Sequence, residues 1–319
     1  MKKLRYGIMG TASIIDRFVG AVRASGQGEV HALASRSLEK AREKGEKLNI
    51  GTCYGSYEEM VKDEEIDVIY VPTINHAHKE NAMLALRSGK HVVVEKPMTL
   101  SEKDTRELFA LAKEKKLFIM EAQKSLFLPV TLQVKEMLDQ GLLGRVHLME
   151  YRISVPEVGF KWFYDLPSGG GAVFGSGNYI LAHSQYLLSD SFTSLRGMAT
   201  LSEKGVDLQC MMMLKSSKGV LVEGKITTLI RADSELNIYG EKGRVRILDF
   251  WKARRALVEI RGEEVREIQV LIDYEMVYEV DHINSCILQG LTESPVMSER
   301  LSVESARLID ELWKDFLQD

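Results

Sequence analysis

Apolar and polar positions along the first 122 residues follow two alternating patterns. Short, nearly continuous apolar runs, typical of strands buried on both faces, are separated by stretches in which apolar residues recur every three or four positions. The predicted strands are 4–10, 29–35, 66–71, 91–95 and 117–122, and the predicted helices are 13–26, 37–48, 57–63, 78–89 and 101–116. Alternating strands and helices are typical of crossover connections, so residues 1–122 are predicted to form a doubly wound α/β domain around a parallel sheet.

Capping residues mark several of these helix boundaries. Ser37 is placed to cap its helix, and Ser56 with Glu59 has the spacing of a capping box. Gly26 and Gly89 follow the last apolar positions of two other helices, where glycine commonly ends a helix.

A different pattern begins after residue 122. Short runs rich in β-branched and aromatic residues follow one another through short turns, which predicts an antiparallel sheet. The predicted strands are 146–155, 208–217, 219–230, 234–240, 243–248, 256–262 and 265–272, and a helix is predicted at 302–318. Residues 123–319 are therefore predicted to form an α+β domain, in which Met211, Met212 and Met213 are expected to belong to the core of the sheet.

Composition agrees with a globular protein of two domains. The chain has 319 residues, of which 45% are hydrophobic and 28% charged, and its net charge is −4. No basic field for nucleic acid or a membrane surface is evident, and no apolar run is long enough to span a bilayer. The three cysteines are far apart and form no C-x-x-C pair, which favours the reducing cytoplasm.

The first predicted strand ends in a glycine turn, Gly10-Thr11-Ala12-Ser13-Ile14. A strand, a tight glycine turn and a helix N-terminus form a binding site for pyrophosphate, because backbone N–H groups face the anion. Ala12 stands where a second glycine is usual, so the motif alone also fits a doubly wound domain that binds no nucleotide.

Ser35 and Arg36 follow the second strand, at the position that usually determines cofactor preference. An acidic residue there would bind the ribose 2′-hydroxyl, whereas an arginine accommodates a 2′-phosphate. The sequence therefore favours NADP over NAD, with a solvent-exposed arginine as the alternative for Arg36 alone.

Several longer segments together resemble the Gfo/Idh/MocA family of oxidoreductases over essentially the whole chain. The segments are YGIMGTASI, VIYVPTINHAH, HVVVEKP, EAQKSLFLP, GGGAVFGSGNY and ESPVMS. The resemblance implies a Rossmann domain, a C-terminal domain built on a large, mostly antiparallel open sheet, and NAD(P)-dependent hydride transfer between alcohol and carbonyl. It also implies a homodimer or homotetramer associated through that sheet.

The resemblance assigns the catalytic roles to Lys96 and Tyr179. It places Lys96 beside the nicotinamide and the substrate, and it implies that Pro97 follows a cis peptide bond. Tyr179 falls where the family has a catalytic His or Tyr, and tyrosine is the choice of its dihydrodiol dehydrogenases. A phenol has a pKa of about 10, so a nearby ammonium group is needed for proton transfer at neutral pH.

Further positions follow from the same resemblance. Thr73, Asn75, His78, Glu95 and Gln123 are expected near the cofactor, with His78 in an orienting role. The expected substrate-side residues are Lys124, Lys161, Trp162, Asn178 and His183, although a histidine packed within its helix is the favoured alternative for His183. His76 and His78 have no third ligand at a sensible spacing, so no metal site is predicted.

The glycine-rich segment 169–179 departs from the family at one position. Gly175 stands where the family commonly has an aspartate, so a carboxylate for binding polyols or relaying protons is missing there. Two functions remain open: an oxidoreductase that acts on a sugar, polyol or diol through Tyr179 and Lys96, and a dinucleotide-binding regulator without turnover. The segment itself is interpreted as a substrate-side loop and not as a phosphate-binding loop, because the turn at Gly10 suits phosphate better.

Overall fold

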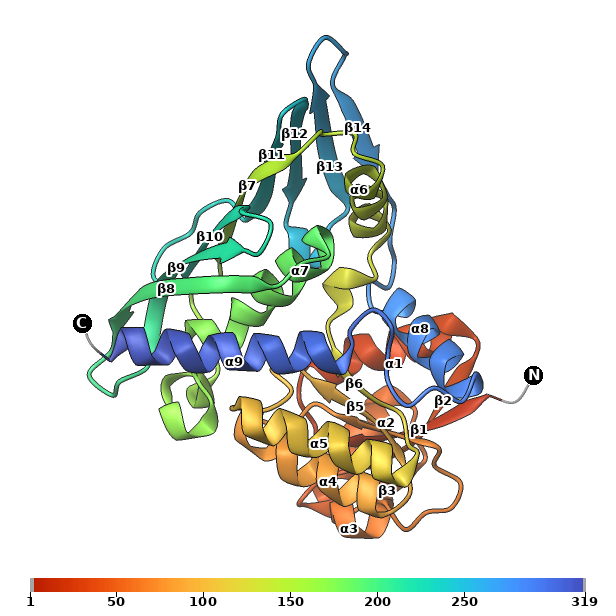
Figure 1. The fold of residues 1–319 in the computed structure, drawn as a ribbon. Helices are drawn as coiled ribbons and strands as arrows, with labels where there is room; N and C mark the ends of the chain where they lie inside the picture. Colours follow the sequence, from red (N-terminus) through yellow and green to blue (C-terminus); the bar gives the residue numbers. More distant parts are fainter. Residues whose placement is uncertain (1–2, 318–319) are drawn as a thin grey trace. The chain divides into compact units, whose positions relative to one another are not determined.

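The computed structural model describes residues 3–317, which divide into two compact units (Figure 1). The first unit contains the chain up to Gln123 and, in addition, Tyr274–Val303. The second contains Lys124–Asp273 and the chain from Glu304 onward. The break after Gln123 is one residue from the expected boundary, but the return of residues 274–303 to the first unit was not foreseen.

The first unit is built on a parallel sheet, which within the described residues has six strands in the order β3-β2-β1-β4-β5-β6. The strands are β1 (Leu4–Met9), β2 (Gly28–Ala34), β3 (Thr52–Tyr54), β4 (Val68–Val71), β5 (His91–Glu95) and β6 (Ile119–Ala122). The helices are α1 (Ile14–Ser25), α2 (Leu38–Leu48), α3 (Tyr57–Met60), α4 (His78–Arg87), α5 (Glu102–Lys115) and α8 (Val277–Leu288). The strand order reverses between β1 and β4, and ligands of such sheets bind outside the carboxyl ends of the strands at this reversal.

Helices cover both faces of this sheet. Figure 1 shows α4 and α5 side by side on one face and α1 and α8 side by side on the other. Burial on both faces explains the continuous apolar runs in β4 and β5. The two predicted N-terminal caps are confirmed, because the side chains of Ser37 and Ser56 accept hydrogen bonds from the backbone N–H groups of Lys40 and Glu59.

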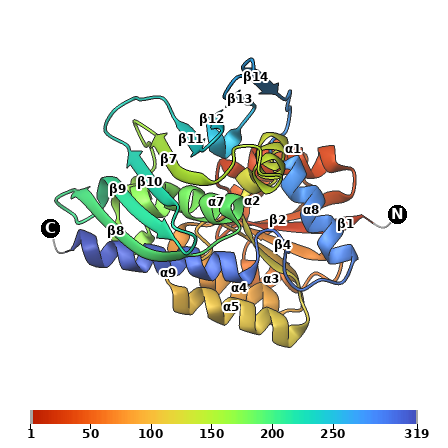
Figure 2. The ribbon, with the colours of Figure 1, turned by 45° about the horizontal axis from the view of Figure 1, so that its top comes forward.

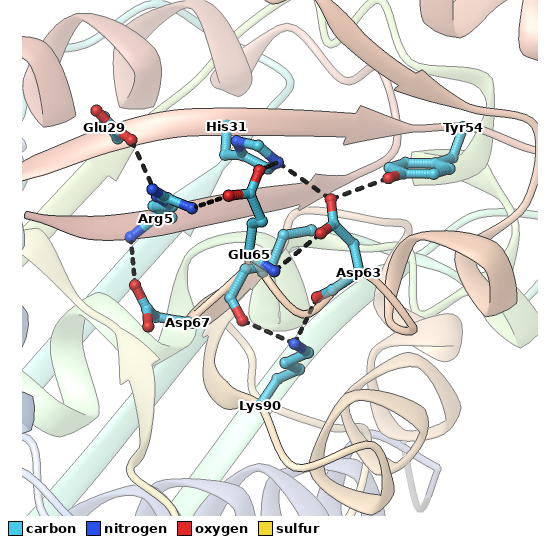
Figure 3. A network of polar contacts seen from close by, with 9 residues as sticks. Arg5, Glu29, His31, Tyr54, Asp63, Glu65, Asp67 and Lys90 are labelled. Atoms are coloured by element: carbon cyan, nitrogen blue, oxygen red, sulfur yellow. Dashed lines mark hydrogen bonds and ion pairs between the residues drawn. The ribbon is translucent and has the colours of Figure 1, made fainter.

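A polar network connects β1, β2, the segment before β4 and the start of β5 in the first unit (Figure 3). The Arg5 backbone N–H donates to Asp67 at 2.9 Å, and the Arg5 guanidinium pairs with Glu65 at 2.6 Å. The ammonium group of Lys90, immediately before β5, donates to the carbonyl oxygens of Asp63 and Ile66 at 2.6 and 2.8 Å. The segment that enters β4 is therefore tied to β1 and to the start of β5.

The second unit contains the large sheet, with eight strands among the described residues in the order β14-β13-β12-β11-β7-β10-β9-β8. Neighbouring strands run antiparallel except β7 and β10, which run parallel. The strands are β7 (Val146–Ser154), β8 (Phe192–Leu201), β9 (Asp207–Ser216), β10 (Leu221–Thr227), β11 (Glu235–Gly240), β12 (Gly243–Leu248), β13 (Arg255–Ile260) and β14 (Arg266–Gln269). The predicted fold class, a parallel-sheet Rossmann domain followed by a large, mostly antiparallel sheet, is confirmed.

Helices pack on one face of the large sheet. They are α7 (Asn178–Leu188), against which α6 (Pro129–Asp139) packs, and the C-terminal part of α9 (Glu299–Phe316). Figure 2 shows α7 lying along the strands, where Ile180 packs close to Gly224 of β10. Leu312 and Phe316 of α9 contact Gly197 of β8 in the same way. Glycines on the strands thus permit close approach of the helices.

The opposite face of β8, β9 and β10 is exposed and partly apolar. Met212 is buried, whereas Met211 and Met213 are 43% and 65% exposed. The expectation that all three methionines belong to the core is therefore wrong, because successive side chains of a strand point to opposite faces of its sheet. Met198 of β8 pairs with Met211 and is also exposed.

The structure contains neither a disulfide bond nor a membrane-spanning helix among the described residues. Cys53, Cys210 and Cys286 are free thiols. Within residues 3–317, no helix has the length and apolar character needed to cross a bilayer.

Candidate active site

The turn after β1 has the geometry of an anion-binding turn. Gly10 has φ +105°, a conformation that favours glycine, and its N–H donates to the Ala34 carbonyl at 2.7 Å. A Cβ at Gly10 would meet only ordinary contacts, at 3.7 Å. Ala12 and Ser13 are exposed, and α1 begins at Ile14. The backbone before α1 is thus open to a ligand, which fits the pyrophosphate of a dinucleotide.

The residues after β2 suit a further phosphate. Ser35 is buried with its hydroxyl near the N–H of Ser37, at 3.4 Å, and Arg36 is exposed. Burial raises the pKa of the Tyr57 phenol, and the positive charge of Arg36 opposes that rise. The Tyr57 hydroxyl also lies 3.7 Å from the position of a Cβ on Gly10. Tyr57 therefore lies near both Arg36 and the glycine turn, although no sequence motif singled it out.

The loop after β4 is tied to the loop after β5 through His78. One ring nitrogen of His78 lies 3.0 Å from the Thr73 carbonyl and the other lies 2.8 Å from the Pro97 carbonyl. Burial lowers the pKa of His78, and these two carbonyl contacts oppose the change. The Thr73 hydroxyl accepts from Asn81 at 3.1 Å, and Asn75 is buried nearby in the turn before α4. His78 thus links the loop after β4 to the loop after β5, and its orienting role stays a prediction.

Lys96 follows β5 directly, and its bond to Pro97 is cis as the resemblance implied. Burial lowers the pKa of Lys96, while the negative charges of Glu95 and Glu121 oppose the change. A lysine whose pKa is lowered can still hold positive charge and can more readily take part in proton transfer.

Two acidic residues fix the surroundings of Lys96. Tyr70 on β4 donates from its hydroxyl to Glu95 at 2.6 Å, and the Tyr70 ring stacks on Phe18 of α1 with centroids 3.7 Å apart. Glu121 on β6 is buried and accepts the Met98 N–H at 2.8 Å, which holds the chain just beyond Pro97. Tyr70 and Glu121 were missed in the sequence, because each is a single residue within an apolar strand.

The glycine-rich segment belongs to the second unit, and other protein atoms occupy the space beside its glycines. Gly169 has φ +75° and Gly171 has φ +111°. A Cβ at Gly170 would overlap the Phe163 carbonyl oxygen, and one at Gly171 would overlap a carboxylate oxygen of Asp207. Neighbouring protein atoms thus require glycine at positions 170 and 171 and leave no space for a phosphate beside them. This supports the interpretation that the segment is not a phosphate-binding loop.

A helical run that carries Tyr179 follows these glycines. A π-helical turn, Val173–Gly177, leads directly into α7, and Tyr179 is the second residue of α7. Tyr179 is half-buried and the preceding Asn178 is buried. A Cβ at Gly175 would lie 3.5 Å from Phe163, an ordinary contact, so space alone does not exclude a side chain there.

The remaining predicted substrate residues have different surroundings. His183 is fully buried, 3.2 Å from the Tyr151 hydroxyl and 3.5 Å from the Thr131 hydroxyl, and burial lowers its pKa to about 3. This placement favours the packed-histidine alternative. Trp162 is half-buried and stacks on Phe160, with centroids 6.1 Å apart.

Three further predicted positions differ in their burial. Gln123 and Lys124 are buried on either side of the break between the units, and Lys161 is exposed. Lys96 belongs to the first unit and Tyr179 to the second. Among the residues described here, no group of three or more His, Cys, Asp or Glu side chains could hold a metal ion.

Comparison with known proteins gives the family. Residues 4–123 match the oxidoreductase family with an NAD-binding Rossmann fold, Gfo/Idh/MocA, and residues 131–246 match the C-terminal domain of the same family. The chain belongs to the Gfo/Idh/MocA family of oxidoreductases. The expected class of enzyme and the nicotinamide-dinucleotide cofactor are thereby confirmed.

Curated relatives include the trans-1,2-dihydrobenzene-1,2-diol dehydrogenases of vertebrates. The Xenopus laevis enzyme is 31% identical over 96% of this chain and 96% of its own length. The human enzyme is 28% identical over 98% of this chain and 96% of its own. These relatives are consistent with the dihydrodiol dehydrogenase-like subset that Tyr179 indicated.

Solved structures share the fold across the whole chain. An aldose-aldose oxidoreductase from Caulobacter crescentus, in complex with glycerol, is 21% identical, covers 99% of this chain and 98% of its own, and has a TM-score of 0.91. A 3-ketoreductase from Actinomadura kijaniata, in complex with NADP and TDP-benzene, is 24% identical with the same coverage and a TM-score of 0.89.

Proposed function

We propose that the protein is an NADP-preferring dehydrogenase or reductase that transfers a hydride between the nicotinamide and a small sugar, polyol or diol. The observation that carries this proposal is Lys96, whose ammonium pKa is lowered by burial at the carboxyl end of β5. In the same unit, the open turn at Gly10 suits a dinucleotide. The named activity of the diol dehydrogenase relatives supports the substrate class.

The proposed binding of the cofactor uses residues of the first unit. The backbone of the Gly10 turn and the N-terminus of α1 would hold the pyrophosphate. Arg36 and Ser35 would hold the 2′-phosphate, which distinguishes NADP from NAD. Thr73, Asn75 and Gln123 would line the path of the cofactor, and His78 would keep the loops after β4 and β5 in register through Thr73 and Pro97.

The proposed chemistry uses one residue from each unit. Bound NADPH supplies the hydride for reduction, and NADP accepts it for oxidation. Tyr179 donates its hydroxyl proton to the substrate oxygen as a carbonyl becomes a hydroxyl, and takes that proton back in the reverse direction. Lys96 stabilises negative charge on the substrate oxygen and on the phenolate that remains. Lys124, Trp162 and Asn178 are proposed substrate contacts.

The test is turnover on a panel of sugars, polyols, diols and ketones, with NADP(H) and NAD(H). Lys96→Ala should lower kcat by about 10²–10³-fold on any active substrate, because an electrostatic contribution to the transition state is lost. Lys90→Ala removes an ammonium from the opposite end of β5 and serves as the matched control, with kcat expected to stay unchanged. Equal losses in both variants, or no turnover on the panel, would contradict the proposal.

A second candidate function rests on Gly175. Without the carboxylate that the family commonly has there, the protein could bind the dinucleotide and regulate a partner without turnover. Micromolar or tighter binding of NADPH, measured by fluorescence, together with no turnover on the panel would favour this function. NADPH-linked turnover that depends on Lys96 excludes it.

Self-association through the large sheet is a further part of the proposal. Met198, Met211, Met213 and Leu221 are exposed apolar side chains on neighbouring strands of the open face, where Lys225 and Glu223 lie opposite Met211 and Met213. Sedimentation velocity should show a dimer or tetramer that dissociates in Met213→Lys, whereas a monomeric wild-type protein would contradict this part of the proposal.

The reducing cytoplasm remains the predicted location of the protein, and the free thiols are in keeping with it.

A further inference from the structure

A buried carboxylate lies beneath the start of the helical run that carries Tyr179. Asp207, the first residue of β9, is fully buried. One of its oxygens accepts the backbone N–H of Val173 at 2.7 Å. Val173 is the first residue of the π-helical turn, so the carboxylate caps this run where the first N–H groups of a helix lack partners within it. Nothing in the local sequence predicts this contact, because 34 positions separate the two residues.

The carboxylate also explains the last glycine of the triple. Gly171 has φ +111°, and a Cβ at this position would overlap the second oxygen of Asp207. The carboxylate of Asp207 therefore occupies the space that a side chain at position 171 would need. Such close packing fixes the backbone at the point where the helical run begins.

We propose that Asp207 is a positioning residue for Tyr179. Its carboxyl oxygen holds the N–H of Val173 and, through the glycine turn, sets the path of the run from Val173 to α7. The proposal rests on the proposed role of Tyr179 in proton transfer.

Val173 and Tyr179 lie close together on one continuous helical run, so the position of the first affects the position of the second. Val173 and Tyr179 are separated by about one and a half turns without a break, so a shift of the first turn is passed on to the phenol. A π-helical turn, Val173–Gly177, lies between them, and such single turns occur frequently at functional sites. A displacement of about 1 Å at a reacting group can cost about 10²-fold in rate.

Three variants separate this role from a general effect on folding. Asp207→Ala removes the acceptor, whereas Asp207→Asn keeps a carbonyl oxygen that can accept from Val173. Asp190→Ala is the matched control: Asp190 follows the other end of α7 and accepts the N–H groups of Ser191 and Lys218, at 2.9 and 3.0 Å. Asp207→Ser, with a hydroxyl acceptor, replaces Asp207→Ala if the latter does not fold.

Steady-state kinetics give the first measurement. We expect Asp207→Ala to lower kcat by about 10–100-fold with an unchanged KM for NADPH, because the cofactor residues belong to the other unit. Asp207→Asn should restore kcat to within about threefold of wild type, and Asp190→Ala should leave it unchanged. An unchanged kcat in Asp207→Ala, or equal losses in the Ala and Asn variants, would overturn the proposal.

Hydrogen exchange gives a second measurement that does not depend on activity. Amides of segment 172–179 should exchange at least about tenfold faster in Asp207→Ala than in wild type, and at the wild-type rate in Asp207→Asn. Unchanged exchange in Asp207→Ala overturns the positioning role even if kcat falls. If the wild-type protein shows no turnover while exchange responds as expected, the proposed function fails and the structural link between Asp207 and the helical run stands.

Discussion

Two glycine turns of this protein share a backbone conformation but differ in what surrounds them. Gly10 and Gly171 have nearly the same backbone conformation, with φ of +105° and +111°. At Gly10, a Cβ would meet nothing closer than 3.7 Å. At Gly171, the same atom would overlap a buried carboxylate. The first turn thus leaves its surface open to a ligand, whereas the second is closed by the protein itself.

This difference gives a criterion for glycine-rich loops in general. A turn that binds phosphate needs glycine so that the ligand can approach the backbone. A turn such as Gly169–Gly171 needs glycine because its own domain already occupies the space. The distance from a Cβ built on the glycine to its nearest neighbour distinguishes the two cases.

Alanine at each turn should give the largest contrast. Gly171→Ala combines an unfavourable φ with overlap of Asp207, so we expect the free energy of unfolding to fall by about 3–6 kcal/mol. Gly10→Ala carries only the conformational cost, about 1–3 kcal/mol, but should raise the KM for the cofactor. Urea unfolding and steady-state kinetics on both variants check this. A larger loss of stability in Gly10→Ala would contradict the comparison.

Removing the Tyr179 hydroxyl should affect chemistry without affecting the turn beneath it. Tyr179→Phe is expected to lower kcat by about 10²–10⁴-fold, because the proton donor is lost, with little change in stability. Tyr186→Phe removes a hydroxyl from the same helix and serves as the control. Similar kcat values for wild type and Tyr179→Phe would remove Tyr179 from the mechanism.

The buried carboxylate should make the stability of the second unit depend on pH. Burial raises the pKa of Asp207 to about 7, and the N–H groups of Val173 and Ala172 oppose the rise. The folded protein therefore binds more protons than the unfolded chain between about pH 4 and pH 7, and this group's contribution to stability falls as pH rises through that window. Cys210, three positions along β9, stays neutral because burial and the Asp207 charge raise its thiol pKa.

Asp207→Asn has no such titration. The free energy of unfolding of this variant minus that of wild type should increase by about 1–3 kcal/mol between about pH 5 and about pH 8. Urea unfolding at a series of pH values checks the sign. A constant difference would show that Asp207 titrates at the same pH in the folded and unfolded chains, and a decreasing one would show that its pKa is lower in the folded protein; either result contradicts the prediction.

Cofactor preference should show the smallest effect. Arg36→Ala is expected to raise the KM for NADPH by about tenfold while leaving the KM for NADH within about twofold, because only the 2′-phosphate contact is lost. Arg42→Ala, on the exposed surface of α2, is the control. Equal changes for both cofactors would mean that Arg36 does not bind the 2′-phosphate.

Elements with a clear local pattern of apolar or capping residues were predicted from the sequence. Elements that depend on packing against distant parts of the chain were not. Continuous apolar runs identified β4 and β5, and the capping signals of Ser37 and Ser56 were confirmed. The short β3 and the helices α6 and α8 were missed. Strand β8 was also missed; its register shifts twice against β9, which interrupts the alternation on which strand prediction depends.

The site shows the same division. Family motifs led to Lys96 and to the cis bond before Pro97, because these residues follow one another in the chain. Tyr57, Glu121 and Asp207 were missed, because each reaches the site only through the topology of its unit. Single residues of this kind carry no spacing signal, and a buried carboxylate in an apolar strand is recognised only when its partner is known.

The polar network of Figure 3 has a consequence for how such a protein can evolve. Arg5, Asp67 and Lys90 lie at or before the starts of β1, β4 and β5. Gly10, Thr73 and Lys96 follow the ends of the same strands. The charges of this network and the groups proposed to meet ligands are thus separated by the length of each strand. Loops at the ligand end can accumulate substitutions and acquire new substrates while the opposite end continues to specify the fold.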